Sequence, residues 1–508
     1  MTASATVAAQ ESGADVEARL RRLEQRQMEY EKQLASRDEK IRQLESQLAA
    51  RQEVRDATAL PPSAQAPAMT QADTSAETPK KMVPVTGQPP AWVAALTGSP
   101  DPDAATANAS FGMFTPGRGF TVARNEWGEL NISAFSYVRY LKQTRMDGHY
   151  VDQFGNLQAV KQRNDLQVNK IILYNSGWFL SPQLRYTFFL WGSDAALGTN
   201  NSVVLAGNLA YIFHPALTLS GGVMALPSTR SLDGQFPQWQ RVDARMLADE
   251  FMRGSYTQGI AASGLLGRHV RYKAVLGNNL SSFGVNASRL DKSLDTRALV
   301  LSWMPTTGEF GPGSNFGDFE QHEELATLFT ARFTSSTEDR ESQFGQSNPE
   351  NTQIRLSSGT TIFTPNALGA GTTIDRVDYR MAAVSAGMKY QGWYVEGEAY
   401  RRWLDDFRYT GNAPGYRSLV DDGFQLQASA MLVPKTVQLY VNGSKVWGDF
   451  GDPWDSGIGL NWWPFKMRGI RLNGEVVYVR RSPVGSPLAP YGVGANGWVF
   501  NANAELAF

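Results

Sequence analysis

Apolar and polar side chains alternate with a period of two from about residue 118 to the C-terminal end of the chain. Between 184 and 190, Leu, Tyr, Phe and Leu take one face of a predicted strand, while Arg185 and Thr187 take the other. The same alternation returns at 424–432 and at 470–478. One face of each strand therefore suits lipid and the other suits water, which is typical of a transmembrane β-barrel.

The links between these strands alternate in length, which indicates two different rims. Short links fall at 181–183, 214–216, 267–269, 391–392, 433–436 and 464–467. Long links fall at about 145–161, 193–201, 228–253, 282–295, 337–376, 406–421, 448–454 and 483–496. Short periplasmic turns below and long extracellular loops above are the arrangement of outer-membrane barrels. We therefore expect an all-β transmembrane barrel of about 16 antiparallel strands over 118–508, although the link at 305–322 is too long for its predicted periplasmic side.

The N-terminal part has a different period. Residues 16–48 repeat every seven residues, and the a and d positions are Val16, Leu20, Leu23, Gln27, Tyr30, Leu34, Arg37, Ile41, Leu44 and Leu48. This pattern predicts an α-helical coiled coil over 16–51, which we expect to be trimeric, and a single solvated helix is the alternative. A flexible N-terminus is expected at 1–15, and an Ala/Pro/Thr-rich linker at 52–117.

Composition narrows the class of protein. No apolar run approaches the roughly 20 residues of a spanning helix, and a mean hydropathy of −0.34 is compatible with strands that are apolar on one face only. The chain has no cysteine, four scattered histidines and a net charge of −1. We therefore expect no metal, no cofactor and no nucleic-acid partner. Tryptophans near strand ends predict aromatic girdles at the two membrane interfaces: Trp178, Trp191, Trp393, Trp403, Trp447, Trp462 and Trp463. The alternative is a large soluble β-protein with an aromatic core.

The last ten residues, 499–508, form a predicted strand that ends in Phe508. Its apolar face carries Phe500, Leu506 and Phe508, and Asn501, Asn503 and Glu505 take the other face. A terminal strand that ends in Phe is similar to the signal by which outer-membrane barrels are recognised for assembly. The expected location is the outer membrane of a bacterial cell, with the coiled coil in the periplasm.

The segment 119–140, GFTVARNEWGELNISAFSYVRY, resembles the opening of the phosphate-selective porin O and P family. In that family a short hairpin with a Gly-Phe start and a Gly turn leads into the first barrel strand. The resemblance covers the barrel region in layout, and at motif level it covers this opening and the closing strand. It implies a homotrimeric porin, a passive diffusion channel for small anionic solutes such as phosphate or dicarboxylates, and it leaves the solute open.

Alternation also assigns pore-lining residues. The inward basic side chains are expected to be Arg139, Arg185, Lys273, Arg332, Arg402 and Arg471. They outnumber the inward acids assigned in the same way, Glu396, Glu398, Glu475 and Glu505. An excess of fixed positive charge in a narrow passage would favour anions. The loop at 228–253 is expected to fold inward, with Arg241 and Arg245 forming the constriction and contacting solute; the alternative is that they only bond the loop to itself or to the wall.

Other functions stay open. A sugar-selective porin would use aromatic side chains in the passage, and Phe189, Trp191 and Tyr440 are inward by alternation. An outer-membrane enzyme is disfavoured because the sequence has no Gly-x-Ser-x-Gly motif and no histidine beside a nucleophile, so we expect no catalytic residue. A structural protein that contacts peptidoglycan through its coiled coil is the third alternative. Membrane lipid and lipopolysaccharide are expected partners of the barrel.

Overall fold

A computed structural model describes residues 112–115, 118–192, 203–233, 236–282, 285, 290, 294–343, 353–485 and 489–508. The chain divides into two units, Met1–Val83 and Pro84–Phe508, and all described residues belong to the second. The N-terminus at 1–15, the coiled coil at 16–51 and the linker up to residue 111 lie outside the described residues and stay predictions.

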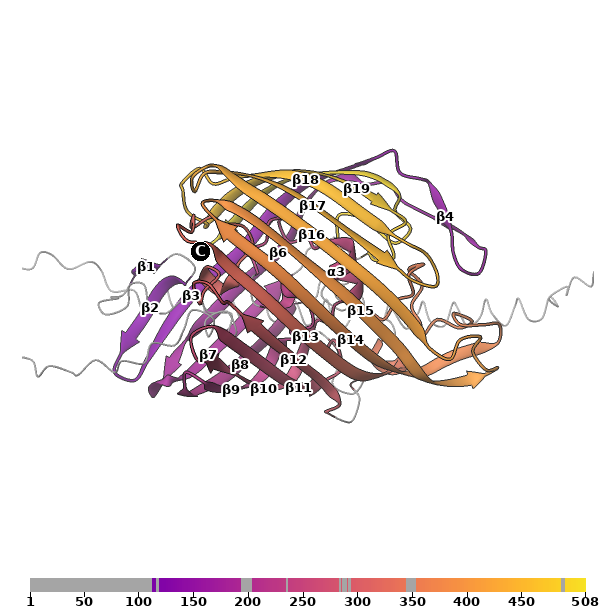
Figure 1. The fold of residues 1–508 in the computed structure, drawn as a ribbon, viewed down its shortest axis with the longest axis horizontal. Coiled ribbons are helices and arrows are strands. Elements are labelled where there is room, and N and C mark those ends of the chain that lie inside the picture. The colour runs from indigo at the N-terminus through magenta and orange to yellow at the C-terminus, as the bar shows by residue number, and fades with distance from the viewer. Residues whose placement is uncertain are drawn as a thin grey trace, which may run out of the picture. The chain divides into compact units, whose positions relative to one another are not determined.

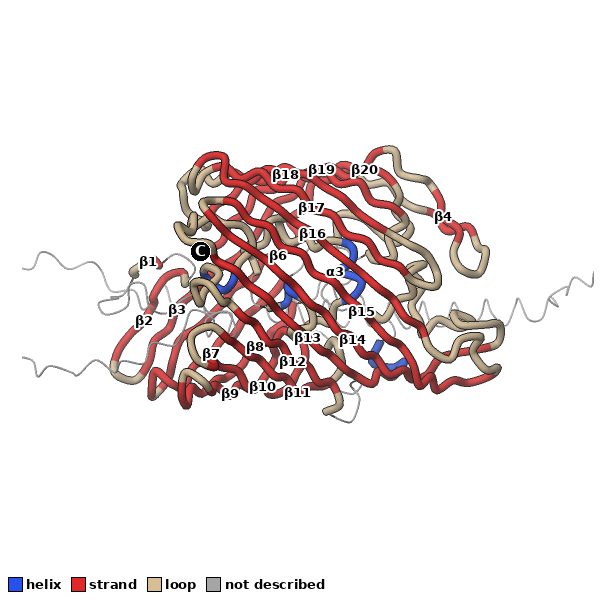
Figure 2. The backbone as a smooth tube through the Cα atoms, in the orientation of Figure 1, coloured by secondary structure: helices blue, strands red, loops and turns tan. Residues whose placement is uncertain are grey.

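Strands make up almost all the regular structure (Figure 2). They are β1 (Phe114–Thr115), β2 (Gly119–Asn125), β3 (Gly128–Thr144), β4 (His149–Val151), β5 (Leu157–Ala159), β6 (Asn164–Phe179), β7 (Ser181–Gly192), β8 (Val203–His214), β9 (Leu217–Ala225), β10 (Tyr256–Leu266), β11 (Val270–Asn278), β12 (Thr296–Trp303), β13 (Ala326–Asp339), β14 (Thr372–Tyr390), β15 (Trp393–Gly411), β16 (Leu419–Val433), β17 (Val437–Trp447), β18 (Trp454–Trp462), β19 (Ile470–Arg480) and β20 (Gly497–Ala507). The helices are short: η2 (Arg230–Leu232), α3 (Leu247–Met252), η4 (Pro312–Ser314) and α4 (Arg340–Gln343).

Sixteen of these strands close into a barrel. From β6 to β20 each strand pairs antiparallel with the next, β3 pairs with β6, and β20 returns to β3 with Asn503 opposite Arg139. The strands cross the wall at a steep slant, as closure of a barrel requires (Figure 1). The predicted count of about 16 antiparallel strands is confirmed.

The barrel wall has an apolar outer face and a polar inner face. Leu205 and Trp393 point outward with 74% and 65% of their surface exposed, while Gln425 and Asn473 point inward and are buried. The alternation predicted at 184–190, 424–432 and 470–478 is present in β7, β16 and β19. Three of the predicted girdle residues are different, because they occupy the inward parity of their segments. Trp191 and Trp463 are buried on the inner side, and Trp178 shares the parity of the buried Ser176 on β6.

The two rims also differ as predicted. On one rim β6 and β7 are joined through Leu180, and β14 and β15 through Gln391 and Gly392. On the other rim the links are long, and the link after β3 carries the hairpin of β4 and β5. Positive backbone φ at Leu180, Gln391 and Gly392 allows the tight turns of the short-turn rim.

The two ends of the barrel sequence meet on the edge of β3. β20 pairs with β3 as far as Ala507 opposite Phe135, and Ala134 then exchanges two backbone hydrogen bonds with Phe508. β2 continues along the same edge, with Phe120 opposite Ile132. The Phe508 ring packs edge-on against Phe120 at 5.7 Å. Ordered pairing begins slightly before the expected linker boundary at 117, because β1 pairs with β2.

Two segments fold into the barrel, one from each rim. The link 226–255 enters from the long-loop rim and carries η2 and α3, and the link 304–325 enters from the short-turn rim and carries η4. They meet inside, where Phe236 and Trp239 of the first share an apolar cluster with Phe310 and Phe316 of the second. The unexpected length of the 304–325 link is explained by this inward course. Within the described ranges, no helix has the length and apolar character needed to cross a membrane.

Candidate functional site

The link 226–255 is bonded around the interior of the barrel. Arg139 of β3 donates to the Val242 carbonyl at 2.7 Å, and Lys170 of β6 contacts Asp243 at 2.7 Å. Further along the wall, Asp455 of β18 accepts from the Leu247 amide, and Ser444 of β17 accepts from the Ala248 amide. Contacts from several sides hold the link across the lumen. The prediction that this loop folds inward is therefore confirmed.

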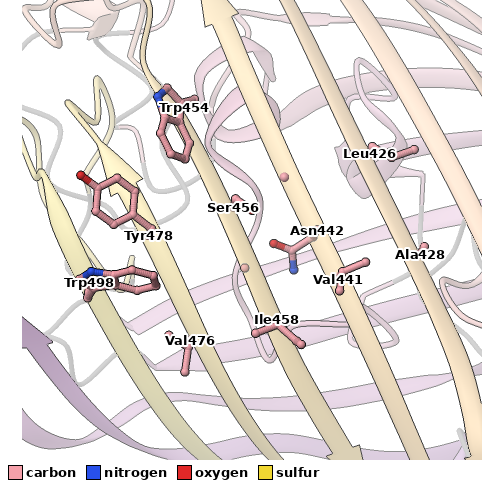
Figure 3. A pocket seen from close by; sticks show the side chains of 12 residues that line it. Leu426, Ala428, Val441, Asn442, Trp454, Ser456, Ile458, Val476, Tyr478 and Trp498 are labelled. Atoms are coloured by element: carbon pink, nitrogen blue, oxygen red, sulfur yellow. The ribbon is translucent and has the colours of Figure 1, made fainter.

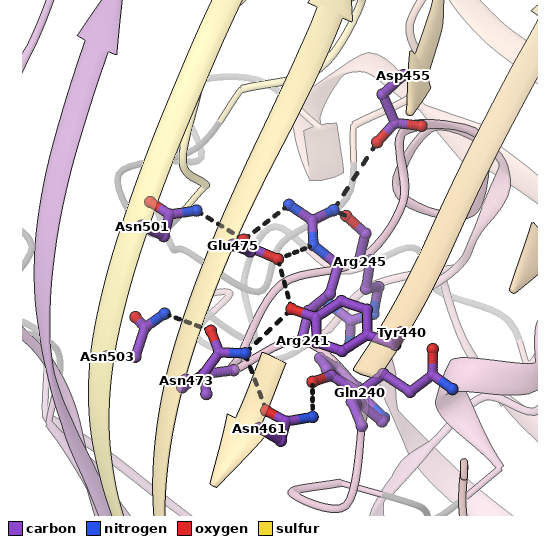
Figure 4. Close-up of polar contacts among 12 residues, drawn as sticks. Gln240, Arg241, Arg245, Tyr440, Asp455, Asn461, Asn473, Glu475, Asn501 and Asn503 are labelled. Atoms are coloured by element: carbon purple, nitrogen blue, oxygen red, sulfur yellow. Dashed lines mark hydrogen bonds and ion pairs between the residues drawn. The ribbon is translucent and has the colours of Figure 1, made fainter. Parts of the chain in front are cut away.

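The densest part of this network joins Arg241 to β19 (Figure 4). Arg241 donates from Nε to Glu475 Oε2 at 2.9 Å and from Nη2 to Glu475 Oε1 at 3.1 Å. Glu475 also accepts from the Tyr440 hydroxyl at 3.0 Å and from Asn501 Nδ2 at 2.6 Å. This bidentate geometry fixes the guanidinium plane of Arg241. Arg245 bonds within the loop, through Ser231 at 2.9 Å and Glu250 at 3.4 Å.

The first turn of the loop docks on β13 and β15. The backbone amide of Arg230 donates to Glu398 Oε1 at 3.0 Å, and its Nε lies 2.7 Å from Glu396 Oε1. Asp233 pairs with Arg332 of β13 at 2.7 Å. Glu396 and Glu398 point inward as predicted, but their role here is to hold this loop against the wall.

A patch of positive charge lies on the wall at β11, beside the Arg332–Asp233 pair of β13. Arg271 and Lys273 are two residues apart on β11, and Lys273 is level with Arg332 across Val300 of β12. Lys273 donates to the Ala225 carbonyl at 3.0 Å, and Arg271 donates to the Ser314 hydroxyl at 2.9 Å. Neither has an ion pair within the described part of the chain, so this side of the lumen carries positive charge that neighbouring carboxylates do not neutralise at contact distance.

The other predicted pore-lining residues all point inward. Arg139 donates to Asn503 at 2.9 Å, and Arg471 forms a pair with Glu505 whose shortest distance is 2.5 Å. Arg402 pairs with Asp421 at 2.7 Å. Arg185 lies on the inner face of β7, the same face as the buried Thr187.

The buried ionisable side chains do not themselves show an excess of positive charge. Among the described residues, buried basic and buried acidic side chains number eleven each. Alternation in strands placed Glu396 and Glu475 correctly, but it missed Asp243 and Asp249, which reach the lumen on the folded loop, and Asp421 and Asp455 near strand ends. The buried set is therefore balanced in charge, and the expected excess of inward positive charge stays a prediction.

The aromatic side chains that alternation placed inward do face the lumen. The Phe189 ring centroid lies 5.9 Å from that of Tyr174 and 6.4 Å from that of Tyr256. Trp191 is buried, with the Lys170 ammonium 4.9 Å from its ring centroid. Tyr440 belongs to the Arg241 network, because its hydroxyl donates to Glu475, and this bond holds its ring in place.

The 304–325 link is held by ionisable groups at the short-turn rim. His322 bonds to Asp318 and lies 3.0 Å from Glu309. Burial works against the charged imidazole, but the bonds to Asp318 and Glu309 raise the pKa of His322 to about 9. Burial likewise opposes the ionised Glu320, but Arg468, paired with it at 3.1 Å, brings the pKa of Glu320 down to about 2. Both charges are therefore present at neutral pH.

Several lumenal residues escaped the sequence reasoning. Arg271 could have been found, because it shares the parity of Lys273 two residues away. Lys389 could also have been found, because it shares the inward parity of Ser385 on β14. It lies beneath Phe310 of the unexpected inward link and donates to the Phe310 carbonyl at 2.8 Å. Arg230 had no usable signal, because it lies in an irregular loop. In the described residues no group of three or more His, Asp or Glu side chains is arranged to hold a metal ion.

These features define a class: a closed 16-stranded antiparallel barrel, apolar outside, whose lumen holds an inward-folded loop. Solved outer-membrane proteins are similar in fold. OmpT of Vibrio cholerae matches over 76% of this chain and all of its own length, at 9% identity and a TM-score of 0.47. The anion-selective porin from Comamonas acidovorans matches over 75% of this chain and 100% of its own length, at 9% identity and a TM-score of 0.46. The outer membrane channel DcaP of Acinetobacter baumannii matches over 76% of this chain and 99% of its own length, at 10% identity and a TM-score of 0.45.

No family model matches the sequence, and no curated protein matches it. At TM-scores below 0.5 the structural likeness carries no argument about activity.

Proposed function

We propose that this chain is an outer-membrane porin, a passive diffusion channel for small hydrophilic anions such as phosphate or dicarboxylates. The observation that carries the proposal is the inward link 226–255, bonded across the lumen of a barrel whose outer face is apolar. A rigid constriction inside a closed wall selects solutes by size and charge and needs no catalytic residue. Similarity to the phosphate-selective porin O and P family stays part of this proposal.

The anion preference is supported by Arg271 and Lys273 of β11. The two residues of β11 present cationic groups whose hydrogen bonds go to neutral oxygens, so a passing carboxylate or phosphate can compete for them. Across the lumen Glu475 and Asp455 neutralise Arg241. We propose that the predicted pore-lining set acts in two ways. Lys273 and Arg185 contribute to the field that solute meets, and the others hold the constriction: Arg139, Arg241, Arg245, Arg332, Arg402 and Arg471.

A homotrimer assembled through the coiled coil, with the coil in the periplasm and with peptidoglycan as a candidate contact, completes the proposal. Loss of residues 1–52 is expected to reduce trimer stability and to leave conduction intact. Retained conduction by this truncated chain would also separate a channel from a purely structural protein.

The test is ion selectivity in planar bilayers. In a KCl gradient the wild-type protein is expected to give a reversal potential close to the equilibrium potential of chloride. Phosphate and a dicarboxylate are expected to block the conductance at millimolar concentration. The double substitution Arg271→Gln and Lys273→Gln is expected to move that potential toward zero. The matched control is Arg401→Gln, which removes an outward charge whose partner is Asp422. Preference for potassium in the wild type would reject the anion proposal, and absence of conductance would reject the channel.

A sugar-selective porin is the second candidate, because Phe189, Tyr174 and Tyr256 form an aromatic group on the lumenal side. A sugar channel is expected to show little chloride preference and to be blocked by an oligosaccharide. Replacement of Phe189 by Leu would then relieve the block and leave the reversal potential unchanged.

A further inference from the structure

Two neighbouring strands, β6 and β7, carry three successive cross-strand pairs on the inner face of the wall. In order along the strands, the pairs are Tyr174 with Phe189, Ser176 with Thr187, and Trp178 with Arg185. The ring centroids of the first pair are 5.9 Å apart, and both members of the middle pair are buried. A pair of small hydroxyl side chains therefore lies between an aromatic pair and a pair that combines an aromatic ring with a cation.

Aromatic side chains on the outer wall have a different setting. Trp454, Tyr478 and Trp498 border an apolar groove on the outer face of the barrel (Figure 3). A membrane interface accounts for aromatic rings in that position. The aromatic rings of β6 and β7 face the lumen instead, beside hydroxyl groups and a guanidinium, so their role has to be sought inside the barrel.

The inner wall at β6 and β7 is more open than the inner wall at β13. All four side chains of the two outer pairs are partly exposed, whereas every inward residue of β13 is buried. The two inward links cover the wall at β13: Asp233 of one pairs with Arg332, and Phe310 of the other shares an apolar cluster with Leu328. A solute inside the barrel can therefore contact the side chains of β6 and β7.

Two buried oxygen atoms in the middle of this wall have no hydrogen-bond partner in the described part of the chain. One is the hydroxyl of Thr187, whose side chain belongs to a residue that is 2% exposed. The other is Oδ1 of Asn208 on β8, which lies directly opposite Thr187 and is 8% exposed. The Nδ2 of Asn208 donates to the Val223 carbonyl at 3.3 Å, which fixes the amide. Water satisfies such atoms in an empty channel, and hydroxyl groups of a solute can replace it.

We propose that this wall binds a monosaccharide that carries an acidic group, such as a hexuronate or a hexose phosphate. The sugar ring packs on Tyr174 and Phe189, its hydroxyl groups bond to Thr187 and Asn208, and its acidic group contacts Arg185. The two outer pairs are four residues apart along each strand, or about 13 Å, which leaves room for one sugar ring with its acidic substituent. This site rests on the proposed porin function, and it combines the anion and the sugar that were its two candidate solutes.

Simpler solutes use only part of this wall. Phosphate or a short dicarboxylate contacts Arg185 and leaves the aromatic rings uncovered. A neutral sugar packs on the rings and leaves the guanidinium without an anion, and an aromatic acid leaves the oxygens of Thr187 and Asn208 without a hydroxyl group. Because a site built to bond a hydroxyl rejects solutes that lack it, the complete set of contacts favours the acidic sugar.

The test is block of the chloride current through the full chain in planar bilayers. Glucuronate and glucose 6-phosphate are the two acidic sugars, and glucose, succinate and benzoate each lack at least one of their features. At least one acidic sugar is expected to block at a concentration about tenfold lower than any of the other three solutes. The acidic sugar that blocks better identifies the acidic group. Equal block by glucose, succinate or benzoate overturns the proposal.

Substitutions separate the hydroxyl contact from the charge. Thr187→Val removes one hydroxyl at nearly constant volume and is expected to weaken block by the acidic sugar about threefold to tenfold. The matched control is Thr334→Val on β13, where a buried hydroxyl also lacks a partner among the described residues but the wall is covered, and block is expected to stay as in the wild type. Arg185→Gln is expected to reduce block by the acidic sugar to the level of glucose. Equal effects of the two threonine substitutions overturn the proposal.

Binding is also measured without conduction, by isothermal titration calorimetry of the full chain in detergent with glucuronate and with glucose 6-phosphate. A chain that binds an acidic sugar and does not conduct contradicts the porin function and leaves this site intact. A chain that conducts chloride and neither binds an acidic sugar nor is blocked by one leaves the porin function intact and overturns the site.

Discussion

Arg241 and Glu475 meet through two parallel hydrogen bonds, Nε to Oε2 at 2.9 Å and Nη2 to Oε1 at 3.1 Å, inside the barrel. Arg241 belongs to the link between β9 and β10, and Glu475 belongs to β19, a strand that is not a neighbour of either. Both side chains are almost fully buried. This pair therefore decides how firmly the inward loop is attached to the wall.

Substitution Glu475→Gln is expected to lower the free energy of unfolding by about 3 kcal/mol, because it leaves the Arg241 guanidinium buried without its counter-charge. The measurement is urea unfolding in detergent micelles. Asp422→Asn is the control: it removes the same type of charge from a half-exposed pair on the outer face, and a change of at most about 1 kcal/mol is expected. Equal losses in the two variants would mean that the buried pair does not anchor the loop.

The contact between the two inward links can be tested by cross-linking. Asn315 Nδ2 donates to Gln238 Oε1 at 3.2 Å, which joins the 304–325 link to the 226–255 link. Because the chain has no cysteine, Gln238→Cys and Asn315→Cys introduce the two thiols of the protein. A short bis-maleimide is expected to link them in the folded barrel, and each single variant is the control. Failure to cross-link in the folded protein, with full reaction after unfolding, would contradict the meeting of the two links.

The barrel could be predicted from the sequence because its signal is local and repeated. Each strand shows which of its positions face inward, as in β20, where Phe500 and Leu506 alternate with Asn501 and Glu505. A short turn also marks every second strand end, except after β12. The count of strands follows from that repetition. The turn at Gln391 and Gly392 needed no knowledge of the partner strands.

The lumen could not be predicted in the same way, because its pairs are distant in the sequence. Lys170 meets Asp243 of the loop, and Arg230 meets Glu396, across separations that no period reveals. Parity placed the arginines inward correctly but could not count the acids that irregular segments bring to them. The inward course of 304–325 was visible only as a link too long for its rim.

The opening hairpin depends on a glycine at position 119. Its φ of +79° is in the left-handed region, and a Cβ there would lie 2.0 Å from the Ile132 carbonyl oxygen. Gly119→Ala is therefore expected to destabilise the protein by about 1–3 kcal/mol and to separate β2 from β3. Gly474→Ala is the matched control, since a Cβ at that position in β19 meets nothing within 4 Å. Urea unfolding of both variants is the measurement, and equal midpoints would refute the steric argument.

The 304–325 link is expected to loosen with rising pH. His322 has an ordinary pKa of 6.5, and its bonds to Asp318 and Glu309 raise the pKa in the folded protein to about 9 against the effect of burial. The charged imidazole therefore stabilises the link fully below about pH 6.5, and this contribution is lost as the pH rises through about 9. A spin label at Glu323→Cys, an exposed neighbour, should show increasing mobility with a midpoint near pH 9. In the His322→Gln background the mobility should be independent of pH over this range, and a wild-type midpoint near 6.5 would mean that the carboxylates do not hold the imidazole.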